Sequence, residues 1–170
     1  NYHYIVPEFT ARQQFSLYCN KPLSEFREAK QEGLNAKPVL LGPVSYLLLG
    51  KEKEGGFHRL ELINRLLPVY FEVLKQLDES NAYYVQLDEP YLSLDLSEKE
   101  RQVFIKTYNE INRRFPNLHI ILTSYFECYG QNLQTALSLP VQTLHLDLVR
   151  CPLQLDDILA TGFVKTKTRL

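Results

Sequence analysis

Apolar positions along the chain follow two spacings, one typical of strands and one typical of helices. Short apolar runs bounded by turn residues predict strands at residues 13–18, 37–41, 83–87, 119–123, 143–148 and 164–170. Apolar positions three and four residues apart predict helices with one buried face at residues 24–31, 60–77, 97–115, 132–139 and 156–160. Because strands and helices alternate from residue 37 onward, we expect an α/β fold of parallel strands joined by right-handed crossovers.

Local signals refine several of these elements. Ser97 and Glu100 have the spacing of a capping box, which predicts a helix start. Pro68 predicts a kink in the helix over 60–77 or a shorter helix that starts at this proline. Gly162 is expected to end the last helix. Residues 44–49 fit a helix and a packed loop equally well.

The strand count falls short of a closed barrel. A closed (β/α)8 barrel normally needs about 250 residues, whereas this chain has 170 and supplies about four or five strands. We therefore expect residues 1–170 to form a single domain that is a partial (β/α)8 barrel of the TIM type. Unpaired edge strands would allow a homodimer to form through those edges. The sequence starts at Asn1 and contains no methionine, so we expect a segment of a longer protein.

Composition excludes several classes of partner. With a formal net charge of −1 the chain has no excess of basic residues, so its composition gives no sign of nucleic-acid binding. The longest apolar run, residues 39–49, is too short and too interrupted to span a membrane. Cys19, Cys128 and Cys151 are odd in number, far apart and without a CxxC pair, so we expect plain thiols without disulfides. That cysteine pattern favours a reduced, cytoplasmic compartment.

The central predicted strand ends in two carboxylates, Asp88 and Glu89, followed by Pro90. Polar residues at the ends of parallel strands face a common site in repeated βα folds. Neighbouring residues of a strand point to opposite faces, so only one of the two carboxylates can face that site. The other would cap the next helix or pair with Arg or Lys. A purely structural carboxylate held by loop amides remains an equal alternative for this position.

The remaining candidate residues, the histidines and Asp147, do not have the sequence spacing of a known metal-binding or catalytic motif. His3, His58, His119 and His145 show neither HxH nor HExxH spacing, so we expect structural roles, with His3 as the exception to watch. His145 and Asp147 are expected to share a strand face, but a metal site needs a third ligand, and no motif in the sequence identifies one. We therefore expect no metal site. A hydrolase that uses Asp88 and Asp147 from separate strands is an alternative without a supporting motif.

Four stretches together resemble the cobalamin-independent methionine synthases. These are NYHYIVPEF at residues 1–9, KPVLLGPVSYLLLGK at 37–51, VQLDEP at 85–90 and LPVQTLHLDLV at 139–149. The resemblance covers essentially the whole chain and corresponds to the N-terminal half of the family. It implies two facing (β/α)8 barrels and methyl transfer from 5-methyltetrahydrofolate polyglutamate to homocysteine. It also implies that zinc lies in the C-terminal barrel, where it activates the homocysteine thiol.

The resemblance also implies that this chain has lost the family's catalytic motifs. In the catalytic barrel a strand ends in Asp-Glu-Pro, its Asp binds homocysteine, and a Glu six residues later binds folate. Here Leu94 stands at that sixth position. The zinc-binding His-x-Cys has no counterpart at residues 123–126, Cys128 is out of register, and Asp147 replaces a Glu ligand. We therefore expect no catalytic residue, no zinc and no other cofactor in this segment.

What the resemblance assigns to the chain is substrate contact. The family's asparagine that opens NYHY contacts folate in the cleft between the barrels, which points to Asn1, with His3 near it and Asp88 as a weaker candidate. The expected partners are 5-methyltetrahydrofolate polyglutamate and the C-terminal catalytic barrel, and the isolated chain is expected to be inactive. The alternative is a truncated relative that acts as a non-catalytic folate-binding or dimerising module.

Overall fold

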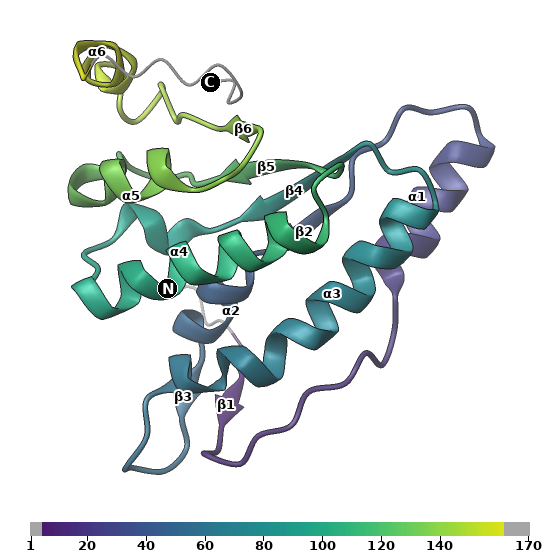
Figure 1. Cartoon of the computed structure of the whole chain (residues 1–170), viewed down its shortest axis with the longest axis horizontal. Coiled ribbons are helices and arrows are strands. Elements are labelled where there is room, and N and C mark those ends of the chain that lie inside the picture. Colours follow the sequence, from purple (N-terminus) through teal and green to yellow (C-terminus); the bar gives the residue numbers. More distant parts are fainter. Residues whose placement is uncertain (1–4, 162–170) are drawn as a thin grey trace.

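The computed structural model describes residues 5–161 and shows a twisted sheet of four parallel strands (Figure 1). The strands are β2 (Val39–Leu41), β4 (Tyr84–Asp88), β5 (His119–Thr123) and β6 (Thr143–Leu144), and they lie in the order β2-β4-β5-β6. A smaller parallel pair is formed by β1 (Glu8–Phe9) and β3 (Lys51–Glu52). The expected class, parallel strands alternating with helices, is therefore confirmed.

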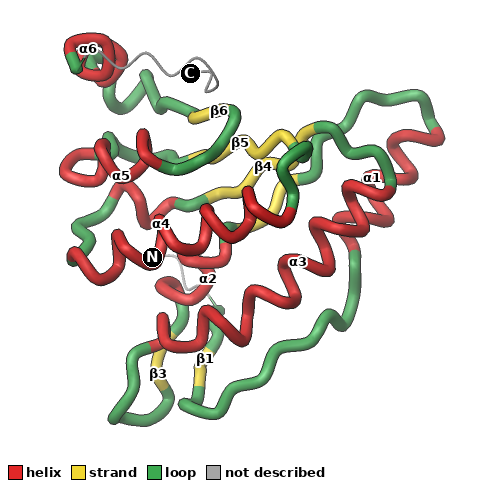
Figure 2. The backbone as a smooth tube through the Cα atoms, viewed as in Figure 1, coloured by secondary structure: helices red, strands yellow, loops and turns green. Residues whose placement is uncertain are grey.

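Six α-helices and three short 3-10 helices connect the strands (Figure 2). The α-helices are α1 (Lys21–Gln31), α2 (Pro43–Leu49), α3 (Ile63–Glu79), α4 (Glu98–Arg114), α5 (Leu133–Ser138) and α6 (Gln154–Ala160). The 3-10 helices are η1 (Arg59–Leu62), η2 (Pro90–Ser93) and η3 (Gly130–Asn132). No helix within residues 5–161 combines the length and the apolar character that crossing a membrane requires.

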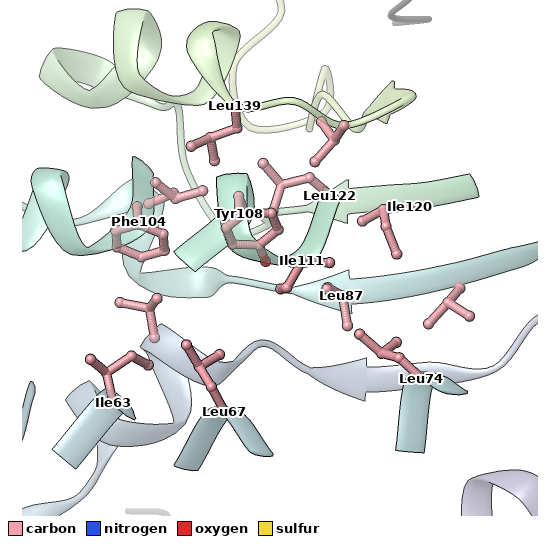
Figure 3. Close-up of a cluster of buried hydrophobic side chains, with 14 of the residues drawn as sticks. Ile63, Leu67, Leu74, Leu87, Phe104, Tyr108, Ile111, Ile120, Leu122 and Leu139 are labelled. Carbon is pink, nitrogen blue, oxygen red and sulfur yellow. The ribbon is translucent and has the colours of Figure 1, made fainter. Parts of the chain in front are cut away.

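The hydrophobic core lies between the sheet and the helices α3 and α4 (Figure 3). Alternate residues of β4 and β5 point toward these helices, and Leu87 and Leu122 are completely buried there. Phe104 and Tyr108 of α4 meet them from the helix side. Burial of apolar surface by both elements stabilises the fold, because removing such surface from water is the main favourable contribution to folding.

The opposite face of the sheet has no helix across it in the described part of the chain. Gln86, Asp88 and Ile121 lie on this face and are only partly buried, and Val39 is 49% exposed. A hollow of about 540 Å³ runs along the face. Parallel sheets are normally covered on both faces, so the open face is a surface suited to contact with further polypeptide.

Most predicted elements are confirmed, with shifts of a few residues at their ends. The capping box is present: the Ser97 hydroxyl accepts a hydrogen bond from the Glu100 amide (3.3 Å), and the Glu100 carboxylate accepts one from the Ser97 amide (2.7 Å). The undecided segment 44–49 is helical and belongs to α2. Helix α3 begins at Ile63 and continues through Pro68, so a helix start at the proline is wrong.

Two strand predictions are wrong in whole or in part. Residues 13–18 alternate between partly buried and exposed positions, with Phe15 and Leu17 against the core, but they pair with no strand of the described chain. The alternating pattern of these residues therefore reflects the packing of one side of the segment against the core, and not hydrogen bonding to a neighbouring strand. The predicted strand 143–148 pairs only over Thr143–Leu144. Gly162 and the predicted strand 164–170 lie outside the described residues.

Candidate functional site

The carboxyl edge of the sheet gathers the polar strand ends that the sequence singled out. Asp88 of β4 pairs in register with Leu41 of β2 and with Thr123 of β5, so these strands end side by side. The His145 amide donates to the Leu122 carbonyl (2.9 Å), which extends the same edge to the residues after β6. The loops after the strands therefore adjoin one another, as the edge of a parallel sheet requires.

Glu89 is a completely buried carboxylate that holds the protein framework. Its two oxygens accept hydrogen bonds from the amides of Val44 (3.3 Å) and Ser45 (2.7 Å), at the first turn of α2, and from the Tyr108 hydroxyl (3.0 Å). A Cβ atom at Gly42 would lie 2.2 Å from the Glu89 carboxyl carbon. Only glycine therefore lets the chain before α2 pass this carboxylate.

Burial makes Glu89 a weak acid. Desolvation raises its pKa to about 7, although the hydrogen bonds from Ser45, Tyr108 and Val44 favour the charged form and oppose the shift. The pKa of Tyr108 is also raised, by its own burial and by the nearby Glu89 carboxylate. Its hydrogen bonds join the end of β4 to α2 and α4, so Glu89 serves the protein framework.

Asp88 lies on the opposite face from Glu89, at the edge of the open side of the sheet. Its carboxylate accepts hydrogen bonds from the side-chain amide nitrogen (Nε2) of Gln86 (2.7 Å) and from the Tyr125 hydroxyl (3.4 Å). The Gln86 side-chain oxygen in turn accepts a hydrogen bond from the Lys37 ammonium group. These contacts form a polar chain across the open face, and Asp88 is its partly exposed carboxylate at the carboxyl edge.

The expected division between the two neighbouring carboxylates is confirmed. One detail of the expectation is wrong: Glu89 caps α2, which precedes it in the sequence, and not the next helix. The reason is that β4 lies beside β2 in the sheet, so the end of β4 meets the helix that follows β2. Sequence distance gave no sign of this neighbour.

Asp147 and His145 have local roles at the carboxyl edge. The Asp147 carboxylate accepts hydrogen bonds from the amides of Phe126 (3.0 Å) and Arg150 (3.1 Å), and these backbone contacts lower its pKa. His145 Nδ1 lies 2.9 Å from the Ser124 carbonyl oxygen. Because β6 ends at Leu144, His145 and Asp147 do not share a strand face.

The histidines of the described residues have contacts within the protein. Within residues 5–161, no group of three or more His, Cys, Asp and Glu side chains is arranged to hold a metal ion. His58 instead caps η1 through its Nδ1, which accepts a hydrogen bond from the Leu60 amide (3.3 Å). His119 packs its ring against Tyr83 and Tyr84.

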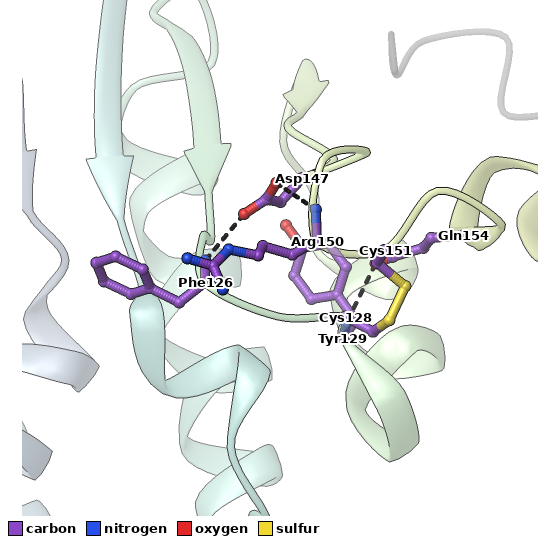
Figure 4. The surroundings of a disulfide bond; sticks show 7 residues. All are labelled: Phe126, Cys128, Tyr129, Asp147, Arg150, Cys151 and Gln154. Atoms are coloured by element: carbon purple, nitrogen blue, oxygen red, sulfur yellow. Dashed lines mark hydrogen bonds between the residues drawn. A yellow bond between two sulfur atoms is a disulfide. The ribbon is translucent and has the colours of Figure 1, made fainter.

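The expectation of three plain thiols is wrong, because Cys128 and Cys151 form a disulfide (Figure 4). Cys128 belongs to the loop after β5 and Cys151 to the loop after β6, and their Cα atoms are 5.2 Å apart. The two strands are neighbours in the sheet, which brings cysteines 23 residues apart to the same edge. Cys19 is the exposed free cysteine among the described residues.

A comparison with protein-family models identifies the family. The model described as "Cobalamin-independent synthase, N-terminal domain" matches residues 1–169. The chain belongs to this family. The resemblance to cobalamin-independent methionine synthase is therefore confirmed over the full length of the chain.

Curated relatives of this synthase family carry the name 5-methyltetrahydropteroyltriglutamate–homocysteine methyltransferase. The relative from Flavobacterium johnsoniae is 64% identical over 170 residues, and that from Cytophaga hutchinsonii is 54% identical over 171 residues. Both alignments cover 100% of this chain. A relative from Rhodopseudomonas palustris is 53% identical over 162 residues, which is 95% of this chain. The chain spans only 22%, 22% and 21% of these relatives, respectively.

Of the three residues expected to contact substrate, the structure describes only Asp88. Asn1 and His3 lie outside the described residues, so their roles stay predictions. Asp88 lies at the carboxyl edge and is partly exposed, and its role in substrate contact also stays a prediction. Sequence reasoning missed Gln86 and Tyr125, the hydrogen-bond partners of Asp88. A signal for Gln86 was present, since residues two apart on a strand share one face.

Proposed function

We propose that this chain forms part of the N-terminal barrel of a 5-methyltetrahydropteroyltriglutamate–homocysteine methyltransferase and helps to bind the folate substrate. The observation that carries the proposal is the partly exposed Asp88 carboxylate at the carboxyl edge of a parallel sheet in a domain of this family. Substrates of parallel α/β folds bind at that edge. The names of the relatives supply the substrate classes.

The open face of the sheet supports the barrel. Helices α3 and α4 cover one face, and the other carries Gln86 and Ile121 beside a hollow. In a (β/α)8 barrel the helices form the outer ring and the second face of each strand points to the barrel interior. We infer that residues 1–170 are a single domain segment whose sheet is completed into a barrel by strands from elsewhere in the enzyme.

The methyl transfer itself is assigned to the missing C-terminal barrel. In the proposed enzyme that barrel would hold a zinc ion, which would supply the activation of the homocysteine thiol, and within residues 5–161 no group of three or more His, Cys, Asp and Glu side chains is arranged to hold a metal ion. The role of this chain is to shape the folate side of the cleft through Asn1, His3 and Asp88 and to support the catalytic barrel. A cytoplasmic location is part of the same proposal.

The alternative of a dimerising module has less support. Strand β2 has three residues and β6 has two, so each exposed edge offers few backbone groups for pairing with a second copy. Short edge strands are one of the ways in which proteins avoid such pairing. No observation in the described residues favours a homodimer.

Calorimetric titration of 5-methyltetrahydropteroyltriglutamate into this chain tests the folate role. We expect binding that weakens several-fold in Asn1→Ala, because a lost hydrogen bond to a ligand is worth about 1 kcal/mol. Asn35→Ala is the matched control, since Asn35 is exposed in the loop between α1 and β2, and it should bind like the wild type. Equal binding by wild type and Asn1→Ala, or no binding by either, would contradict a folate site on this segment.

A further inference from the structure

The disulfide joins the two loops that form the carboxyl edge beside β5 and β6. The first loop, residues 124–129, contains Cys128, and the second, residues 145–153, contains Cys151. Figure 4 shows residues of both loops gathered around the disulfide, among them Phe126 and Tyr129 from the first loop and Asp147 from the second. The covalent link therefore acts on the backbone that surrounds the proposed site.

Hydrogen bonds link the first loop to the second loop and to the first residue of α6 independently of the disulfide. The Tyr129 hydroxyl donates to the His145 carbonyl (2.9 Å), and the Tyr129 amide donates to the Gln154 side-chain oxygen (3.2 Å). The Asp147 carboxylate accepts from the Phe126 amide (3.0 Å). None of these bonds involves a sulfur atom, so they continue to hold Cys128 near Cys151 after reduction, while the segments between them lose the covalent constraint.

The first loop contains a residue with a strained backbone and lies beside two unpaired polar groups. Phe126 has a backbone φ of 85°, in the left-handed region that bulky residues rarely adopt, and its side chain is 66% exposed. The Ser124 hydroxyl and the Gln154 side-chain nitrogen are buried without a hydrogen-bond partner in the described structure. Buried polar groups are normally paired. A rearrangement of the loops would release both the strain and these unpaired groups.

The same loop also contacts the proposed site directly. Tyr125, three residues before Cys128, donates its hydroxyl hydrogen to Asp88 (3.4 Å). A shift of residues 124–129 would therefore move one of the two identified hydrogen-bond partners of the Asp88 carboxylate. Loop position and the state of the cysteine pair are linked to the ligand-binding edge through this tyrosine.

We propose that Cys128 and Cys151 form a reversible thiol–disulfide switch that fixes the carboxyl-edge loops when oxidised and frees them when reduced by a dithiol. Disulfides in cytosolic proteins are usually transient or redox-sensing. The effect on ligand affinity and the cytosolic setting rest on the proposed function. The chemistry of the pair and the motion of the loops do not.

The reduction is a two-step exchange that balances. A thiolate of the dithiol attacks Cys128 sulfur, because Cys128 is partly exposed whereas Cys151 is only 7% exposed. Cys151 leaves as a thiolate and takes up a proton. The second thiolate of the dithiol then attacks the dithiol's own sulfur in the mixed disulfide. Cys128 leaves as a thiolate and takes up a proton, and the dithiol is left oxidised to a cyclic disulfide. Both electrons come from the dithiol. Reoxidation is the reverse exchange, in which a disulfide of the same class accepts the two electrons and is reduced to its dithiol.

The first test asks whether the folded protein exchanges. Cys19→Ser removes the third thiol, and this variant is treated with thioredoxin-class dithiol protein or with dithiothreitol under native conditions. We expect mass spectrometry after alkylation to count no thiol before treatment and both thiols after it. Hydrogen–deuterium exchange should rise in residues 124–129 and 145–153 and stay constant in α4. Reduction only after unfolding, or unchanged exchange in both loops, would overturn the switch.

The second test links the switch to ligand binding. We expect reduction of Cys19→Ser to weaken its affinity for 5-methyltetrahydropteroyltriglutamate at least threefold. The matched control, Cys19→Ser/Cys128→Ser/Cys151→Ser, should not respond to reductant. Equal affinity of the two redox states would contradict the link to Asp88. Absence of binding in both states would contradict the proposed function, while the exchange measurement would still decide the switch.

Discussion

Replacement of Glu89 by alanine is expected to lower the free energy of unfolding by about 3–5 kcal/mol. The change leaves the Val44 and Ser45 amides and the Tyr108 hydroxyl buried without the acceptor that they share, and it opens a cavity in the core. Urea denaturation followed by circular dichroism measures the loss. Asp88→Ala is the matched control, because the partly exposed partners of Asp88 can bind water instead, and it should cost less than about 1 kcal/mol.

Wild type and Glu89→Ala, compared across pH, should show the protonation of Glu89. Its pKa is raised from 4.5 to about 7 in the folded protein, so the folded state binds the proton more tightly than the unfolded state does. The resulting contribution to stability is complete below pH 4.5 and is lost as the pH rises toward 7. The stability difference between wild type and Glu89→Ala should therefore shrink over this interval. A difference that grows with pH would contradict the buried, weakly acidic carboxyl.

Gly42→Ala is the second substitution with a large expected effect, a loss of about 3 kcal/mol of stability. The new Cβ atom would lie 2.2 Å from both the carboxyl carbon and one oxygen of Glu89, which cannot yield without breaking its hydrogen bonds to α2. Thermal denaturation measures the loss. Gly55→Ala is the matched control, since a Cβ atom there meets nothing within 4 Å. Equal melting temperatures for the two variants would refute the close approach.

Local sequence signals predicted the elements that local chemistry determines. The capping box at Ser97 and the apolar stripe behind it placed α4 correctly, because both act within one or two turns. Period-two alternation also separated Asp88 from Glu89. Residues 44–49 stayed ambiguous because a seven-residue helix has too few positions to show a helical period, and the cap that stabilises α2 comes from Glu89, 44 residues away from Ser45.

The errors arose where long-range neighbours decide the outcome. The spacing of Cys128 and Cys151 resembles no local motif, and they pair only because β5 and β6 are adjacent in the sheet. Residues 13–18 pack against the core like one side of a strand but find no partner strand among the described residues. The polar chain from Lys37 through Gln86 to Asp88 likewise requires β2 to lie beside β4.

The central claim is that the two neighbouring carboxylates have different roles. Asp88 contributes to ligand binding at the carboxyl edge of the sheet, and Glu89 stabilises the protein framework. The most direct measurement compares Asp88→Asn with Glu89→Gln by titration with 5-methyltetrahydropteroyltriglutamate and by thermal denaturation. We expect Asp88→Asn to bind at least fivefold more weakly and to melt within about 2 °C of the wild type. Glu89→Gln should melt at least about 5 °C lower, because 1 kcal/mol shifts a domain of this size by roughly 2–4 °C, and should bind normally while folded. Normal binding by Asp88→Asn together with a lowered melting temperature would contradict the account.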